Sequence, residues 1–90
     1  MRIHYELSRR TAENDLKTYI QSNPSLTREE AINKWIINKF KPWITNNINE
    51  DDTKFVIQSV TDEPIGFIVT FQIEEDGKRF LSMLGGQKYD

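Results

Sequence analysis

The chain of 90 residues contains no cysteine, and this absence excludes several chemistries together. Without thiols there are no disulfides, no thiolate nucleophile and no cysteine-ligated metal, and the composition suits a reducing compartment. The longest apolar run falls far short of the roughly 20 residues that a membrane-spanning helix needs. The first residues also lack the apolar segment of a signal peptide. We therefore expect a cytoplasmic protein that makes no contact with a membrane.

Motifs for catalysis and cofactor binding are missing as well. His4 is the only histidine, so the chain has no histidine pair for a metal and no second imidazole base. None of the five serines lies in a Gly-x-Ser-x-Gly elbow. The only glycine cluster, Gly85-Gly86, does not form a phosphate-binding loop. We expect no enzyme activity, no catalytic residue, no metal site and no cofactor.

The length and composition favour one small domain that spans residues 1–90. The hydrophobic fraction of 37% is sufficient for one core at this length. The net charge is −2, but its distribution is uneven. Residues 1–43 carry eight basic and five acidic side chains, whereas residues 44–90 carry four basic and nine acidic ones. The two halves can therefore attract each other or form a polarised surface.

Hydrophobic periodicity predicts a strand and two helices in the first half. Apolar residues alternate over residues 1–7, which is typical of a half-buried strand. A helical spacing then favours a helix that begins at Ser8 and ends near Ser22, just before Asn23-Pro24. Thr27 and Glu30 fit a capping box at the start of a second helix. Pro42 is expected to end or kink that helix, with one further turn possible.

The second half predicts three strands. Residues 55–60 are rich in β-branched side chains and favour a strand, and residues 62–66 favour a turn. Alternation over residues 66–74 predicts the next strand, and Asp76-Gly77 is the favoured pair for a type I′ hairpin. A last strand over residues 79–84 would then place Ile73 opposite Phe80 and Glu75 opposite Lys78. The predicted fold is α+β in two layers, in the order β-α-α-β-β-β, with both helices on one face of an antiparallel sheet.

This register also predicts a surface for a partner. Ile68, Leu81 and Met83 would lie on the sheet face away from the helices, where apolar side chains need cover. Trp43 follows Pro42 and is a candidate aromatic anchor. The strand over residues 79–84 would be an edge that a second copy can extend. We therefore predict a protein partner or self-association through Ile68, Leu81, Met83 and Trp43.

Three lysines in the second predicted helix raise the alternative of nucleic-acid binding. Lys34, Lys39 and Lys41 interleave with aromatic residues, which is one pattern of single-strand binding. Helical spacing instead places the aromatic residues on the buried face and the lysines in solvent. A helix-turn-helix with the hairpin as a wing is also conceivable, but its second helix would begin Arg28-Glu29-Glu30 and turn carboxylates towards phosphates. We expect no nucleic-acid partner and keep this fold as an alternative.

Residues 55–68 suggest a family. The stretch from Phe55 to Val60, followed by Asp62-Glu63-Pro64-Ile65-Gly66, resembles the second and third strands of GNAT-type N-acetyltransferases and the turn between them. The expected order of elements resembles the N-terminal half of that family. The family's acetyl-CoA loop would follow the fourth strand and open a helix, but this sequence ends after Gly85-Gly86 and four more residues. The resemblance therefore implies a non-catalytic remnant or a fragment that a partner completes, and it assigns no cofactor-binding residue.

These observations favour a non-catalytic interaction module that binds and modulates a protein partner. The content of Lys, Asn and Ile suits an accessory protein of a phage or mobile element. Half of a GNAT-like acetyltransferase and a winged-helix nucleic-acid binder are the alternatives.

Overall fold

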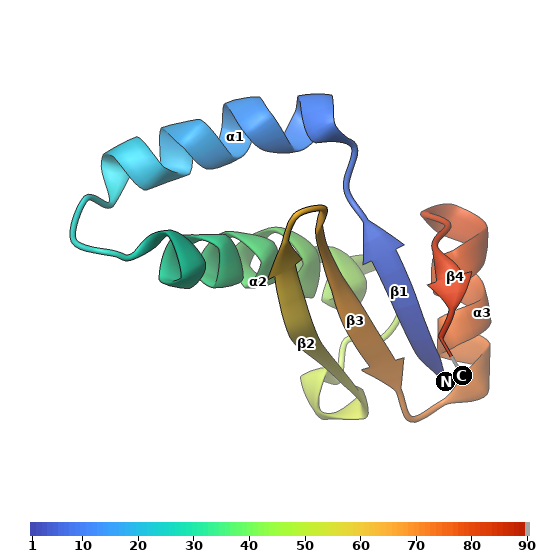
Figure 1. The fold of residues 1–90 in the computed structure, drawn as a ribbon. Coiled ribbons are helices and arrows are strands. Elements are labelled where there is room, and N and C mark those ends of the chain that lie inside the picture. The colour runs from blue at the N-terminus through green and yellow to red at the C-terminus, as the bar shows by residue number, and fades with distance from the viewer. Residues whose placement is uncertain (90) are drawn as a thin grey trace.

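The computed structural model describes residues 1–89, with the backbone alone at Thr11 and Ser59. It is an α+β fold with one antiparallel sheet, as the sequence predicts (Figure 1). The elements in chain order are β1 (Arg2–Glu6), α1 (Arg9–Ser22), α2 (Arg28–Asn47), the 3-10 turn η1 (Asp52–Lys54), β2 (Phe55–Asp62), β3 (Ile65–Phe71), α3 (Glu74–Met83) and β4 (Gln87–Lys88).

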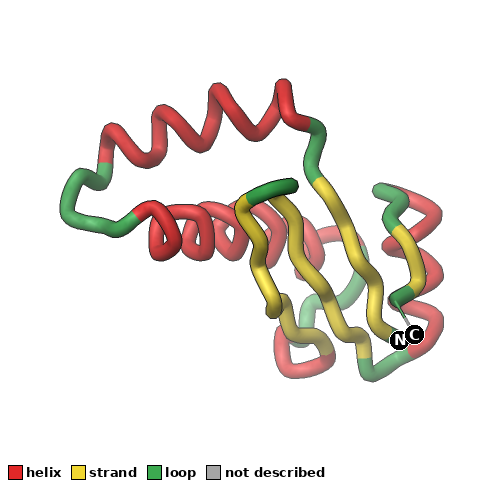
Figure 2. The backbone as a smooth tube through the Cα atoms, viewed as in Figure 1, coloured by secondary structure: helices red, strands yellow, loops and turns green. Residues whose placement is uncertain are grey.

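The sheet has four strands in the order β2-β3-β1-β4 (Figure 2). β1 lies antiparallel to β3, with Ile3 opposite Val69 and Tyr5 opposite Phe67. β2 and β3 form a hairpin whose turn contains the cis peptide bond Glu63-Pro64. The first strand of the sequence therefore lies in the middle of the sheet, where neighbours cover both of its edges.

The first two helices form as predicted. Thr27 Oγ1 accepts a hydrogen bond from the amide of Glu30, and Glu30 Oε1 accepts one from the amide of Thr27, both at 3.2 Å. This capping box satisfies amides that the first turn of α2 would otherwise leave without a partner. Pro42 does not end α2, because the helix continues to Asn47 with the proline inside it. The extra turn brings Ile44 into the core, where it is fully buried.

The prediction of a hairpin at Asp76-Gly77 is wrong. Residues 74–83 form helix α3, and the expected final strand over residues 79–84 does not exist. Glu75 and Lys78 do approach each other, with Oε1 and Nζ 3.5 Å apart, but they do so along one helix and not across two strands. The order of elements is consequently β-α-α-β-β-α-β, with a short β4 that the sequence did not indicate.

Two physical causes favour the helix over the hairpin. Gly77, Phe80 and Leu84 recur at helical spacing, and Phe80 is fully buried when that side of the helix faces the core. Three acidic residues occupy the first turn of α3, where the partial positive charge of the helix N-terminus stabilises carboxylates. Ile73, which was expected to lie opposite Phe80 in the hairpin, precedes the helix and is 42% exposed.

Aromatic rings build the core between the sheet and two helices. Phe40 of α2 packs against Phe67 of β3 in a tilted arrangement, with ring centres 4.7 Å apart. Phe80 of α3 contacts Tyr5, Phe71 and Trp43, with ring centres 5.7–6.0 Å away. Because Trp43 belongs to α2, these contacts place α2 and α3 on the same face of the sheet (Figure 1). The sequence predicted α1 and α2 on that face. In the structure α3 takes the place expected for α1, and α1 lies along α2.

We expect Phe80→Ala to lower the free energy of unfolding by about 3–5 kcal/mol, because it empties a fully buried aromatic site. Met83→Ala is the matched control in the same helix, since Met83 is 50% exposed, and its effect should stay below about 1 kcal/mol. Urea unfolding monitored by tryptophan fluorescence measures both. Similar losses in the two variants would contradict the placement of α3.

Candidate functional site

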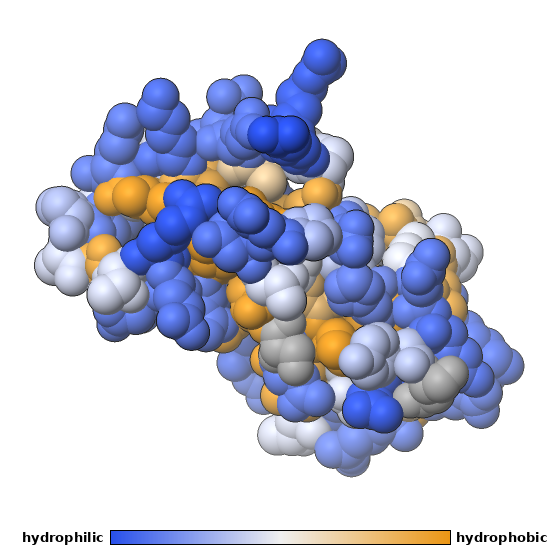
Figure 3. Space-filling model, in the orientation of Figure 1, coloured by the Kyte–Doolittle hydropathy of each residue, from blue (hydrophilic) through white to orange (hydrophobic). Residues whose placement is uncertain are grey.

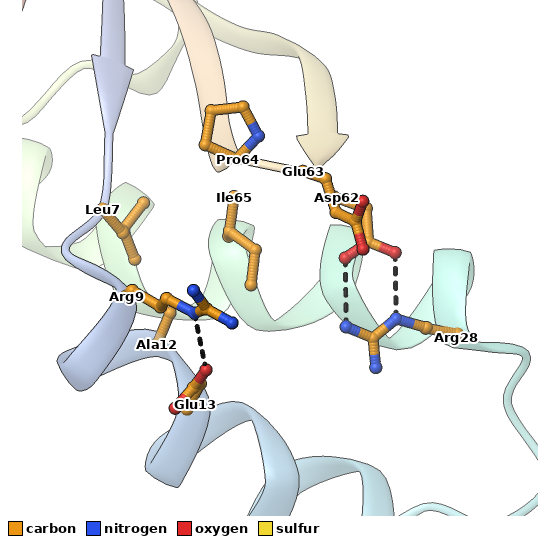
Figure 4. A pocket seen from close by; sticks show the side chains of 9 residues that line it. All are labelled: Leu7, Arg9, Ala12, Glu13, Arg28, Asp62, Glu63, Pro64 and Ile65. Carbon is orange, nitrogen blue, oxygen red and sulfur yellow. Dashed lines mark hydrogen bonds and ion pairs between the residues drawn. The ribbon is translucent and has the colours of Figure 1, made fainter.

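A groove runs between α1 and the turn of the β2–β3 hairpin. Its first hollow has a volume of about 470 Å³ and opens between the start of α1, the start of α2 and the hairpin turn (Figure 4). Leu7, Ala12 and Ile65 form an apolar floor, and Pro64 extends it. Charged side chains surround this floor at Arg9, Glu13, Arg28, Asp62 and Glu63.

The groove continues along α1 into a second hollow of about 590 Å³. Glu13, Arg28 and Ile65 line both hollows, so the two form one continuous depression. The residues that α1 contributes extend from Arg9 to Gln21, which is about 20 Å along a helix. Figure 3 shows hydrophobic surface in the hollow beneath α1, between that helix and the rest of the molecule. We call this depression the α1 groove.

The α1 groove exists because α1 packs mainly on α2. Its apolar stripe is narrow: Ala12 and Leu16 are buried, while Tyr19 and Ile20 are half-buried. A stripe of this width is covered mostly by α2, and the hairpin turn stays apart from the helix. The side of α1 that carries Arg9, Glu13 and Lys17 is left facing the opening.

Ion pairs hold the charged rim of the groove. Arg28 donates two hydrogen bonds to Asp62, from Nε to Oδ2 at 2.9 Å and from Nη2 to Oδ1 at 3.0 Å. This fork joins the first residue of α2 to the last residue of β2. Arg9 Nε donates to Glu13 Oε1 at 3.0 Å within α1 (Figure 4). The rim therefore has nearly balanced charge. The apolar floor is the feature that distinguishes the groove.

The hydrogen bonds from Arg28 lower the pKa of Asp62 below the ordinary carboxyl value of 3.8. The same hydrogen bonds, together with the charge of Asp62, raise the pKa of the Arg28 guanidinium. Both side chains are substantially exposed, at 60% for Arg28 and 44% for Asp62. Solvent screening therefore keeps the contribution of the pair to stability at about 1 kcal/mol or less.

The predicted partner-binding residues do not form one surface. Ile68 is on the face of the sheet away from α2 and α3, as expected, and is half-buried. Leu81 and Met83 belong to α3, so they are not its neighbours across a hairpin as the sequence suggested. Leu81 packs partly against the core, and Met83 is 50% exposed. Trp43 is half-buried against Phe80.

The three lysines of α2 are exposed, as helical spacing predicts, while Trp35 and Phe40 are buried. Lys39 and Lys41 already face carboxylates, because their Nζ atoms lie 3.6 Å from Asp15 Oδ2 and 3.4 Å from Asp52 Oδ2. Within residues 1–89, no group of three or more metal-ligating side chains converges. No helix of this part of the chain is long and apolar enough to cross a membrane.

Sequence reasoning missed the α1 groove and one buried acid. Arg28 and Asp62 are 34 positions apart, and no local pattern links them. Asp76, which would have lain at a hairpin tip, is only 7% exposed and accepts a hydrogen bond from Asn49 Nδ2 at 2.9 Å. This bond joins the start of α3 to the loop after α2.

Comparisons with protein families, with curated proteins and with solved structures found no match to this chain. The turn on which the acetyltransferase resemblance rests does lie between two antiparallel strands. The resemblance itself stays a prediction.

The Arg28–Asp62 pair gives a prediction for pH dependence. A carboxylate with a lowered folded-state pKa stabilises the fold above its unfolded pKa, and this stabilisation is lost as the pH falls through the folded value. We therefore expect Asp62→Asn to cost up to about 1 kcal/mol at pH 7, and this difference from the unsubstituted protein should vanish as the pH falls from about 4 towards 2.

Urea unfolding at a series of pH values measures this difference. Glu63→Gln is the control, since it changes the neighbouring acid and leaves both hydrogen bonds to Arg28 in place. A difference between Asp62→Asn and the unsubstituted protein that persists unchanged at pH 2 would show that the pair does not form.

Proposed function

We propose that this chain is a non-catalytic interaction module that binds a protein partner by holding a segment of it in the α1 groove. The observation that supports this proposal most directly is the shape of the groove. It is an apolar-floored depression about 20 Å long, which suits an elongated polypeptide segment better than a compact small molecule.

The chemistry of the groove indicates what such a segment offers. Its rim carries near-equal numbers of acidic and basic groups, and the main ones are already paired with each other. A partner therefore gains little from charge and most from burying apolar side chains against the half-buried Ile65 and Ile20. An amphipathic helix or an extended segment with apolar anchors has this character.

Charge also favours a protein partner over a nucleic acid. The net charge is −2, and two of the three lysines on α2 face carboxylates of the same chain. Phosphates would have to displace those carboxylates, so the electrostatic gain that drives nucleic-acid binding would be small.

We expect a partner that co-purifies from the native host to lose at least about tenfold in affinity for Glu13→Trp, because an indole there obstructs both hollows of the groove. The substitution removes only an exposed ion pair with Arg9, so the fold should tolerate it. Thr18→Trp is the matched control, since Thr18 is an exposed residue of the same helix that lines neither hollow.

Calorimetry of the purified partner with the two variants separates the outcomes. Equal affinities for Glu13→Trp and Thr18→Trp would place the binding surface outside the groove. Failure to recover any partner would contradict the proposed function as a whole.

A further inference from the structure

The backbone around the α1 groove is already hydrogen-bonded. One wall is the helix α1, whose backbone groups bond mostly along the helix itself. On the other wall, the carbonyl of Ile65 accepts a hydrogen bond from the amide of Leu7 at 2.9 Å. The carbonyl of Pro64 accepts one from Thr61 Oγ1 at 2.7 Å, and a proline has no amide hydrogen to donate. The groove therefore offers side chains to an occupant and no row of free backbone groups.

The strands of the sheet barely reach the groove. Within residues 1–89 they contribute the last residue of β2, Asp62, and the first residue of β3, Ile65, and these two are paired with each other. An extended segment gains much of its affinity by pairing its backbone with a strand edge. In this groove its amides and carbonyls would lose water without gaining partners, which is unfavourable. A helix satisfies its own backbone and avoids this cost.

We propose that the occupant of the α1 groove is an amphipathic helix of the partner, about 13 residues long, that lies along α1. This inference rests on the proposed function and specifies the conformation of the bound segment. The length follows from the groove, because about 20 Å corresponds to about 13 helical residues. An isolated helix this short is marginal in water, so the segment would become helical as it binds.

The apolar side chains of the groove suit such a helix. Ala12, Leu16 and Ile20 lie four positions apart along α1, so they form a stripe with one residue per turn. Ile65 points from the hairpin turn towards α1 (Figure 4). Ile20 and Ile65 are half-buried and still have apolar surface to cover. A helix with apolar residues three and four positions apart would pack its own stripe against them.

Two charges at opposite ends of the groove give it a polarity. Glu63 lines the first hollow and Lys17 the second, and within residues 1–89 neither side chain makes an ion pair. A bound helix with a basic side chain near Glu63 and an acidic one near Lys17 would pair with both. Because both groups are exposed, these pairs would orient the helix more than they strengthen its binding.

Two synthetic peptides of about 14 residues test the helical occupant. They share one composition of leucine, alanine and glutamine, with a glutamate at one end and a lysine at the other. In the first peptide the leucines recur three and four positions apart, as on a helix face, and in the second they alternate with polar residues, as on a strand face. We expect calorimetry to show at least about tenfold tighter binding of the first peptide, and the helical circular dichroism of its mixture with the protein to exceed the sum of the two components.

Three results would overturn the proposal. They are equal or tighter binding of the alternating peptide, binding of the first peptide without a gain in helicity, and no binding of either peptide up to about 1 mM.

Variants of the protein test whether the first peptide binds in the groove. Glu13→Trp should weaken its binding at least about tenfold, because the indole obstructs both hollows, and Thr18→Trp should not. Equal binding to these two variants would also overturn the proposal, because the peptide would then bind elsewhere.

The polarity has its own test. Lys17→Glu should weaken binding of the first peptide about two- to fivefold. Arg10→Glu makes the same change of charge at an exposed position of α1 that lines neither hollow, and it should have little effect. Equal effects of the two substitutions would reject the charge arrangement.

Failure of this inference can be told apart from failure of the proposed function. If Glu13→Trp weakens binding of the co-purified partner but the two peptides bind alike, the groove remains the partner site and its occupant is not a helix. If Glu13→Trp leaves binding of the co-purified partner unchanged, the proposed function itself fails.

Discussion

The packing of Phe80 determines the arrangement of the molecule. Its ring touches Tyr5 of β1, Phe71 of β3 and Trp43 of α2, so one side chain joins three elements to α3. Aromatic burial of this kind contributes several kcal/mol, which is comparable to the whole net stability of a small domain. Both α2 and α3 are thereby held on one face of the sheet.

The surfaces left for binding follow from that arrangement. With α2 and α3 on the same side, no element within residues 1–89 covers the opposite face of the sheet or the β2 edge. α1 lies along α2, and the separation between α1 and the hairpin turn becomes the groove. The fork between Arg28 and Asp62 links that turn to the start of α2. The proposed partner site is thus a consequence of the same packing.

The first 47 residues could be predicted well because their signals are local. The alternation of β1 and the capping box of Thr27 and Glu30 need only neighbouring residues to be recognised. Asp76-Gly77 is different, because the same residues suit a tight turn or the first turn of a helix. The choice depends on burying Phe80 against Trp43, a contact between distant parts of the chain that periodicity does not encode.

The candidate site was beyond sequence reasoning for the same reason. The partner surface predicted from Ile68, Leu81 and Met83 depended on a strand over residues 79–84, and it was lost with that strand. The α1 groove instead brings together α1, the start of α2 and the β2–β3 turn. Predicting this groove requires knowing that α1 packs mainly on α2, which is a contact between elements that no local pattern encodes. Ile68 kept its predicted face because that assignment needed only the alternation within β3.

The helical state of residues 74–83 and the position of Phe80 are the most direct test of this account. A nuclear Overhauser spectrum of the assigned protein measures both. We predict sequential amide–amide cross-peaks along residues 74–83 and ring contacts between Phe80 and Trp43. Extended-strand patterns in that segment, with cross-peaks between Ile73 and Phe80 across a turn at Asp76-Gly77, would contradict it.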